Sequence, residues 1–393
     1  MDLDAFRWLL TDAGQQLLVT AAGEYAAAHG DPVRAATALR RLAPADHAAA
    51  ALTQVELRGR AAAKFGAEAG RMYFTPDGLE QATRPRVAAH RAARLAAAEP
   101  AGVLDLGCGI GGDMVALARA GLTIAGVDLD PVRVEVARAN LAALGLPGAV
   151  QVADGTTLGL DGFGAVFADP VRRGARGRVF DAEGWTPPWP FVTSLLERVS
   201  VVKVAPGIPH DLVPDRVEAE WVSEDGEVKE AALWSPYLAT TLRRATVIRK
   251  GGLATLTAED DPYDGSERPV RPLGGFLYEP DGAVIRAGLV TAVAAGVDGG
   301  LVDGHIAYVT SDQSFHTPFA RGYQVLEEVP YREKQLKAAL RERSIGRLTI
   351  KKRGVDVVPD QLRKRLDLRG DNEATLVMTR VAGTGTALLV RPF

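Results

Sequence analysis

The stretch Val103–Gly112, with the sequence VLDLGCGIGG, decides how this chain is expected to fold. A short apolar run leads into a glycine-rich loop, and the amphipathic segment DMVALARAG follows directly. Glycines at such a junction let the backbone turn tightly and approach a ligand closely, while the following helix presents N–H groups that lack partners within the helix. The spacing also matches G-x-G-x-x-G through Gly112, so this motif alone leaves a dinucleotide site open.

The sequence after this loop continues to alternate between strand and helix signals. Apolar runs of strand length occupy residues 102–107, 122–130, 149–155, 163–170 and 200–207, and segments with helical spacing lie between most of them. This alternation indicates right-handed βαβ units and a parallel sheet. After residue 215 the pattern becomes typical of antiparallel strands, with a turn expected at Glu224-Asp225-Gly226.

Acidic residues at the strand ends narrow the choice of ligand. Asp105 lies two positions before Gly107, where a carboxylate disfavours a pyrophosphate and suits a cationic or amino-acid-like ligand. Asp128 closes the second strand, where it can accept both hydroxyls of a ribose. Asp154 closes the third strand, where it can accept from an adenine amino group. Asp130 precedes a proline and is expected to cap a helix instead.

This series of motifs resembles the class I S-adenosylmethionine-dependent methyltransferases, with DLGCGIG as the glycine motif, GVDLD as the ribose motif and VADG as the adenine motif. The resemblance implies an α/β fold with a mostly parallel, seven-stranded Rossmann-like sheet that contains a late antiparallel strand. It implies S-adenosylmethionine as the cofactor. The residues that it assigns to the cofactor are Asp105, Gly107, Gly109 and Gly111 for the methionine part, Asp128 for the ribose and Asp154 for the adenine.

The fourth strand ends in Phe167–Gly174, FADPVRRG. Ligands of open α/β sheets lie beyond the carboxyl ends of the strands, so this segment is expected to face the methyl group of the cofactor. Methyltransferases that act on nucleobase amines carry Asp/Asn-Pro-Pro-aromatic here, and the resemblance implies that Asp169 and Pro170 are catalytic. Val171 and Arg172 depart from the second half of that motif. An ordinary turn that follows a strand is the alternative.

Several residues near this segment are candidates for contact with a substrate. Arg172 and Arg173 suit base stacking or phosphate binding, and Trp185 suits stacking. Solvated loop charges and a packed aromatic ring are the corresponding structural alternatives. Lys203, at the end of the fifth strand, is expected to be a surface lysine, and a role in the site is the alternative. Cys108 is expected to be a packing residue.

Composition excludes several classes of protein. The single cysteine permits neither an intramolecular disulfide nor a cysteine zinc site, and the six histidines show no metal-binding spacing, so no metal is expected. No apolar run is long enough to cross a membrane, and the first residues lack the features of a signal peptide. A cytosolic protein without a membrane partner is therefore expected.

Charge is distributed unevenly along the 393 residues, whose net charge is -3. Residues 331–370 contain thirteen lysines and arginines against five acidic residues, so the remainder of the chain is distinctly acidic. The run Lys351, Lys352 and Arg353 lies in this segment. A basic region on an otherwise acidic protein favours nucleic-acid binding, and a solvated helix face is the alternative.

Four segments are expected: a helical region at 1–97, a methyltransferase domain at 98–250, a β-rich connecting region at 251–325 and a basic α/β module at 326–393. Together with FTPDGLEQATRPRVAAHRA, DLGCGIGGD and FADPVRR, the C-terminal sequence SIGRLTIKKRGVDV resembles a bacterial class I methyltransferase with a THUMP-like domain. A fainter similarity to trimethylguanosine synthase-type enzymes implies that residues 83–86 contact the cofactor pocket.

The THUMP-like resemblance implies a structured RNA, tRNA or rRNA, as partner. The expected reaction is methyl transfer to a base nitrogen of that RNA. The alternatives are a non-catalytic scaffold that binds cofactor and RNA, and a methyltransferase that acts on a small molecule or a protein.

Overall fold

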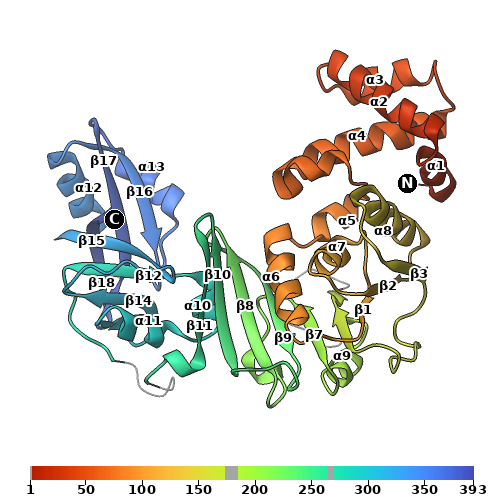
Figure 1. Cartoon of the computed structure of the whole chain (residues 1–393). Coiled ribbons are helices and arrows are strands. Elements are labelled where there is room, and N and C mark those ends of the chain that lie inside the picture. The colour runs from red at the N-terminus through yellow and green to blue at the C-terminus, as the bar shows by residue number, and fades with distance from the viewer. Residues whose placement is uncertain (1, 173–184, 264–268) are drawn as a thin grey trace. The chain divides into compact units, whose positions relative to one another are not determined.

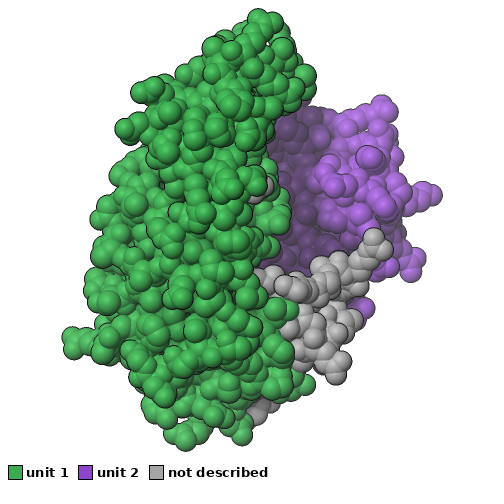
Figure 2. Space-filling model, turned by 90° about the vertical axis from the view of Figure 1, so that its right-hand side faces the viewer, with its two compact units in different colours: residues 1–217, 232–239 green, residues 218–231, 240–393 purple. Residues whose placement is uncertain are grey.

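The computed structural model describes residues 2–172, 185–263 and 269–393 (Figure 1). The chain divides into two compact units, residues 1–217 with 232–239 and residues 218–231 with 240–393 (Figure 2). The division passes through strand β9 (Glu227–Trp234), which therefore belongs to both units. The segment borders that the sequence predicts at residues 97 and 250 remain predictions. The border predicted at residue 325 lies inside strand β15 (Ala320–Val329).

Unit 1 begins with a group of helices whose starts are marked in the sequence by capping residues and prolines. Asp2, Thr11, Asp31 and Thr75 each accept hydrogen bonds from the first turn of a helix. These helices bury a common core that includes Phe74, so Phe74→Ala is expected to remove about 3–5 kcal/mol of stability. The elements are α1 (Leu3–Leu9), α2 (Asp12–Ala27), α3 (Pro32–Leu39), α4 (Ala45–Phe65), η1 (Gly66–Gly70), α5 (Pro76–Gln81) and α6 (Pro85–Ala96).

The parallel sheet of unit 1 confirms the predicted alternation of strands and helices. Its strands are β1 (Val103–Leu106), β2 (Ile124–Asp128), β3 (Ala149–Val152), β4 (Ala165–Ala168) and β7 (Ser200–Val204), with the helices α7 (Gly112–Arg119), α8 (Pro131–Leu144) and α9 (Trp189–Leu195). Strand β1 pairs in parallel with β2 and with β4, so that Leu106 lies opposite Val127 on one side and Ala168 on the other. Helices α6, α7 and α8 pack against this sheet in one apolar core.

The sheet continues through β9 to β8 (Glu218–Glu224), β10 (Arg243–Arg249) and β11 (Gly252–Thr257). The order β3-β2-β1-β4-β7-β9-β8 contains the seven expected strands, and β10 and β11 bring the number in the described residues to nine. The expected turn is confirmed, because Asp225 and Gly226 adopt φ angles of +51° and +86°, as a tight hairpin requires. Strand β10 pairs with β8 in parallel, unlike the antiparallel arrangement that was expected.

A second sheet lies within unit 2, with the order β13-β14-β12-β15-β18-β17-β16. Its remaining strands are β12 (Phe276–Pro280), β13 (Gly300–Asp303), β14 (Ile306–Ser311), β16 (Ile345–Lys352), β17 (Asn372–Val381) and β18 (Thr384–Pro392). The helices of this unit are α10 (Gly282–Arg286), α11 (Val290–Gly296), α12 (Glu333–Glu342) and α13 (Pro359–Leu366). Alternation along β17 puts Leu376 and Met378 in the core with α12 and α13, while Val377 joins the core with Tyr308 and Tyr323.

Within the described residues, no helix combines the length and the apolar character that a membrane span requires.

Candidate functional site

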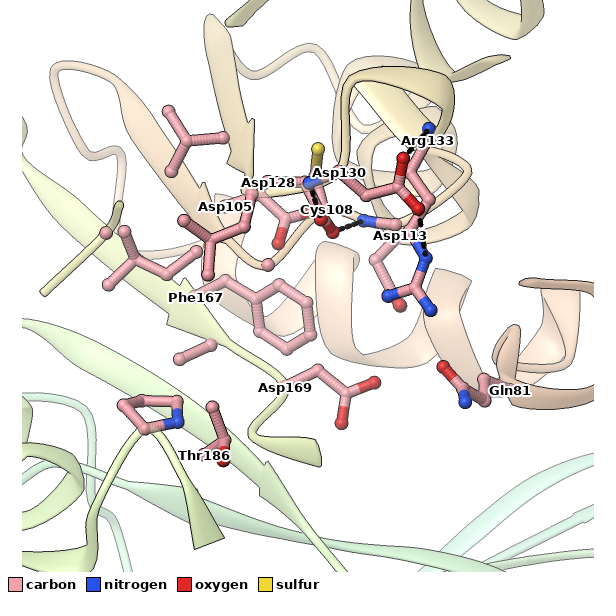
Figure 3. Close-up of a pocket in the computed structure, with 18 of the residues that line it drawn as sticks. Gln81, Asp105, Cys108, Asp113, Asp128, Asp130, Arg133, Phe167, Asp169 and Thr186 are labelled. Atoms are coloured by element: carbon pink, nitrogen blue, oxygen red, sulfur yellow. Dashed lines mark hydrogen bonds and ion pairs between the residues drawn. The ribbon is translucent and has the colours of Figure 1, made fainter. Parts of the chain in front are cut away.

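A cavity of about 580 Å³ opens in unit 1 at the carboxyl ends of the parallel strands. Figure 3 shows Asp105, Phe167 and Asp169 facing this cavity, with Gln81 of α5 at its side. The predicted residues that line it are Asp105, Gly107, Gly109, Asp128, Asp154 and Asp169. Pro170 and Gly111 are not among the lining residues. The position of the cavity agrees with the rule that ligands of α/β sheets lie beyond the strand ends.

The glycine loop adopts a backbone that other residues tolerate poorly. Gly107, Gly109 and Gly111 have φ angles of +83°, +55° and +81°. A Cβ atom on Gly111 would lie 3.1 Å from the Cβ of Ala137, so helix α8 also restricts this position. Gly111 therefore lies on the side of the loop that packs against α8, while Gly107 and Gly109 line the cavity.

The carboxylate of Asp128 is oriented by the backbone around it. Its Oδ2 accepts a hydrogen bond from Gly109 N at 3.0 Å, and its Oδ1 accepts one from Asp130 N at 2.9 Å. Each carboxylate oxygen can accept a further bond, so a ribose hydroxyl remains compatible with this geometry. The predicted cap is confirmed, because Asp130 Oδ1 accepts from Val132 N at 2.8 Å.

Asp105 is the most unusual carboxyl group of the cavity. It is 1% exposed, and neither of its oxygens accepts a hydrogen bond from any described residue. Burial, together with the nearby negative charges of Asp113, Asp169 and Asp128, raises the pKa of Asp105 well above its usual range, and Arg91 opposes this shift only in part. A buried carboxyl without a partner suits a cationic ligand group such as an ammonium. This arrangement fits the methionine part of S-adenosylmethionine.

Helix α6 is tied to the glycine loop through Asp113, in the first turn of α7. Arg91 of α6 forms an ion pair with Asp113, and Thr83 Oγ1 donates to Asp113 Oδ2 at 3.0 Å. The Arg91 guanidinium also lies 4.6 Å from the ring centre of Phe167. Arg91 and Asp113 were not among the predicted site residues, although a lone arginine on the apolar face of α6 indicates a buried partner.

Asp154 lies at the edge of the cavity and is exposed. Its Oδ1 accepts from Thr156 Oγ1 at 2.7 Å and from Thr156 N at 2.9 Å. These hydrogen bonds lower the pKa of Asp154, so it is a carboxylate at neutral pH. Its expected contact with adenine remains a prediction.

Asp169 is paired with Lys203, which corrects the expectation that this lysine is a surface residue. Lys203 Nζ lies 2.5 Å from Asp169 Oδ2, and the two side chains are 15% and 30% exposed. The cause is the register of the strands, since Phe167 of β4 lies opposite Val201 of β7. Two residues further along, both side chains return to the same face of the sheet.

The aromatic residues that line the cavity with Asp169 are phenylalanines, whereas the sequence predicted Trp185. Phe167 and Phe191 line the cavity, and Phe191 belongs to α9, which follows the proline-rich segment. The backbones of Arg172 and Trp185 pair as strands β5 (Val171–Arg172) and β6 (Trp185–Thr186). Arg173 lies outside the described residues. Phe191 was missed because Trp185, in the same segment, was a better candidate by residue type.

The basic run of unit 2 is partly neutralised by a glutamate. Lys351 Nζ lies 3.0 Å from Glu279 Oε2, and an Arg353 Nη2 atom lies 4.0 Å from Glu279 Oε1. Arg353 also lies 5.3 Å from the ring centre of Tyr308, whereas Lys352 is exposed. None of these three residues lines the cavity of unit 1, and their expected contact with a substrate remains a prediction.

No group of three or more histidine, cysteine or acidic side chains suited to a metal ion occurs among the residues that the structure describes. Cys108 is a buried residue of the glycine loop and lines the cavity. Burial, together with Asp105 and Asp128, raises the pKa of its thiol. A thiol in this state is a poor nucleophile and a poor ligand.

Three family models match parts of the chain: a methyltransferase domain at residues 103–171, a THUMP domain-like family at residues 320–392 and a domain of unknown function at residues 2–61. The sequence is 38% identical over 352 residues to an uncharacterized S-adenosylmethionine-dependent methyltransferase found in two strains of Mycobacterium tuberculosis, covering 86% of this chain and 95% of the relative. Among solved structures, a methyltransferase structure from Porphyromonas gingivalis W83 matches with a TM-score of 0.73 at 22% identity, covering 96% of this chain and 98% of the other.

Proposed function

We propose that this chain, which belongs to the S-adenosylmethionine-dependent methyltransferases, methylates a base nitrogen of a structured RNA. S-adenosylmethionine is its cofactor, and this group supplies a methyl made electrophilic by its sulfonium. The observation that carries the choice of a nitrogen is the position of Asp169, whose carboxylate faces the cavity at the end of β4. The match of residues 320–392 to a THUMP-like family supports RNA as the partner.

Residues of the cavity have separate roles in holding the cofactor in this proposal. Asp105 receives the ammonium of the methionine part, because its buried carboxyl has no donor among the described residues. Asp128 accepts from the ribose hydroxyls, and the backbone of Gly107 and Gly109 forms the floor. Asp154 accepts from the adenine amino group at the exposed edge.

Asp169 and Lys203 act on the substrate side. Lys203 holds Oδ2 of Asp169, which turns the second oxygen toward the substrate amine. The N–H group of the amine donates to this oxygen, so that the nitrogen lone pair is aligned for reaction. The new N–C bond would form as the bond between the methyl group and the sulfonium sulfur breaks and the sulfur leaves as a neutral thioether. The nitrogen then loses a proton, and Asp169 accepts it as a general base. Phe191 provides an aromatic face beside the reacting base.

Methyl transfer to RNA by the purified full chain tests this proposal. The chain is incubated with isotopically labelled S-adenosylmethionine and total bacterial RNA, and the labelled nucleoside is identified after digestion. We expect label in an N-methylated base with the wild type and loss of most of that label with Asp169→Ala. Label in a protein or small-molecule fraction with none in RNA would contradict the RNA substrate, and label in an O-methylated ribose would contradict the role of Asp169.

A further inference from the structure

A second cavity, of about 340 Å³, lies within unit 2, far along the sequence from the glycine loop. Nine described residues line it, and none of them is acidic. Three of them are the basic residues Arg249, His316 and Arg321, and two are the aromatic residues Phe315 and Phe393. None of these residues belongs to the basic segment 331–370 that the sequence singles out.

The two arginines come from different strands and are held in different ways. Arg249 ends β10, and its Nη2 lies 3.8 Å from Oδ2 of the buried Asp281, which also caps α10. The side chain of Arg249 is nevertheless 42% exposed. Arg321 lies on β15, and its guanidinium carbon is 5.6 Å from the ring centre of Tyr323. Among the described residues, no carboxylate lies within ion-pair distance of Arg321, which is exposed.

Phe393 provides a fixed aromatic surface beside these cations. Its ring lies against the backbone of Gly322, where a Cβ atom would approach Phe393 Cζ to 2.5 Å. The rings of Phe276 and His316 contact it edge to face, with centres 5.6 Å and 5.5 Å away. Phe393 still exposes 42% of its surface. An aromatic ring that is held in place and yet exposed is suited to stacking with a planar ligand.

We infer that this cavity binds a phosphodiester of single-stranded RNA through Arg249, His316 and Arg321, with the adjoining base stacked on Phe393. Arginines bind phosphate oxygens through paired N–H groups. No residue that lines the cavity has an acidic side chain, and Asp281 beside Arg249 lies outside the lining. Stacking requires a base that is not already stacked in a duplex, so a loop or an end of a folded RNA is the expected ligand. The inference rests on the proposed function, because it takes RNA as the partner.

Binding of a fluorescein-labelled single-stranded RNA of about ten nucleotides to the full chain, measured by fluorescence anisotropy, tests the inference. Arg321→Gln should weaken binding about tenfold and lower the slope of log K against log salt by about one. Arg321→Lys should retain more affinity than Arg321→Gln, and His316→Gln should weaken binding less. Phe393→Leu should weaken binding about fivefold or more without a change in the salt slope.

Arg380→Gln is the matched control, because Arg380 is an exposed arginine of β17 that lies outside both the cavity and the basic segment 331–370. Unchanged binding of S-adenosylmethionine and an unchanged thermal unfolding transition of each variant show that both units are folded. The inference is wrong if Arg321→Gln binds the RNA as tightly as Arg380→Gln does. It is also wrong if a glutamate-rich peptide displaces the RNA as effectively as unlabelled RNA and Phe393→Leu has no effect, since the site then belongs to an acidic protein.

Failure of the inference can be told apart from failure of the proposed function. If the wild type methylates RNA while Arg321→Gln binds it normally, the proposed function stands and the assignment of this cavity falls. If the wild type methylates no RNA while Arg321→Gln still weakens RNA binding relative to Arg380→Gln, the cavity assignment stands and the proposed substrate is wrong.

Discussion

The charged groups of the two units differ in what surrounds them. In unit 1, Asp105 is buried and no described residue donates a hydrogen bond to its oxygens. In unit 2, most of the basic side chains between residues 331 and 370 lie beside carboxylates. The pairs are Lys337, Arg341 and Arg369 with Asp367, Arg343 with Glu327, Arg347 with Glu373, Lys351 and Arg353 with Glu279, Arg363 with Asp360 and Arg365 with Glu333.

A charged side chain that has no ion-pair partner within the protein therefore indicates a binding site better than a run of like charges in the sequence does. A cation that already has a carboxylate partner must give up that interaction before it gains one with a ligand. A buried carboxyl without a partner loses no interaction within the protein when a cationic ligand binds. It gains an ion pair that the folded protein itself does not provide. Arg321 in unit 2 also lacks a carboxylate within ion-pair distance among the described residues, although it is exposed and Asp105 is buried.

Asp169→Ala is expected to have the largest effect, because it removes the acceptor at the reacting edge of the cavity. The rate of methyl transfer should fall about 10²–10⁴-fold, while the affinity for S-adenosylmethionine should stay nearly unchanged. Single-turnover kinetics at saturating cofactor, with calorimetry for cofactor binding, check both values. Asp161→Ala is the control, since Asp161 is a fully exposed acidic residue outside the cavity. Equal rates for the two variants would remove Asp169 from the mechanism.

Asp105→Asn should weaken cofactor binding by about 10–100-fold, because the ammonium loses its charged partner. The same change should stabilise the ligand-free protein by about 1–3 kcal/mol at neutral pH, since a neutral amide costs less to bury than a carboxylate. Calorimetry and urea denaturation measure the two effects. Asp113→Asn provides the contrast and should destabilise the protein, because Asp113 is an ion-pair partner of the buried Arg91. A loss of stability in Asp105→Asn would show that Asp105 has a protein partner.

Lys203→Met should lower the rate of methyl transfer about tenfold by releasing Asp169 from its fixed orientation. Lys203→Arg should restore part of the rate, because it can still donate to Asp169 Oδ2. The matched control is Lys229→Met, since Lys229 is similarly exposed, at 16%, and pairs with Glu227 outside the cavity. The pH profile of the rate should change in Lys203→Met and not in the control. Identical profiles would reduce Lys203 to a structural role.

The contribution of Asp105 to the stability of the ligand-free protein should fall as the pH rises above about 4, the usual pKa of an aspartate in an unfolded chain. Burial raises the pKa of Asp105 in the folded state, so the folded protein holds this proton more tightly than the unfolded chain does. That advantage is present at low pH and is lost as the pH rises toward the raised pKa. The stability difference between Asp105→Asn and the wild type should therefore grow with pH, and a constant difference would contradict the raised pKa.

Glu279→Gln should have the smallest effect of these substitutions, and it should strengthen RNA binding, whereas the other substitutions weaken catalysis or binding. It removes the carboxylate beside Lys351 and Arg353, so the affinity for RNA should rise about twofold to threefold if charge pairing is what limits this region. Anisotropy with the same labelled RNA measures the change, and Glu328→Gln, at an exposed position of β15, is the control. An increase much larger than that of the control would mean that the basic segment is itself the main RNA site.

The glycine loop was predictable because close approach to a ligand and a positive φ angle both require glycine. Gly107, Gly109 and Gly111 all have positive φ angles, and few other residue types adopt this conformation without strain. The strand ends carrying Asp105, Asp128 and Asp169 were predictable for a related reason, since the carboxyl ends of parallel strands meet at one edge. The class of fold therefore followed from local patterns, and the cofactor followed from the resemblance of these motifs to the class I methyltransferases.

Other features depend on strand register and on long-range packing, which local patterns do not encode. The pairing of Lys203 with Asp169 joins residues thirty-four positions apart and follows from the register of β4 and β7. The ion pair of Arg91 with Asp113 depends on how α6 packs against α7. The strands β12, β13 and β14 join the same sheet as the C-terminal strands, although their sequence looked like a connecting region.

The sequence by itself determined the parallel sheet, the glycine loop and the acidic residues at its edge, because each rests on a residue type that its local conformation demands. Only the tertiary structure decided which charges are matched by partners within the protein and which face a cavity. Electrostatic pairing depends on distance in space, and Lys351 with Glu279 lies seventy-two positions apart in sequence yet 3.0 Å apart in the fold. That is why the basic run, prominent in the sequence, is partly neutralised, while Arg249, His316 and Arg321 converge on a cavity that no sequence motif marks.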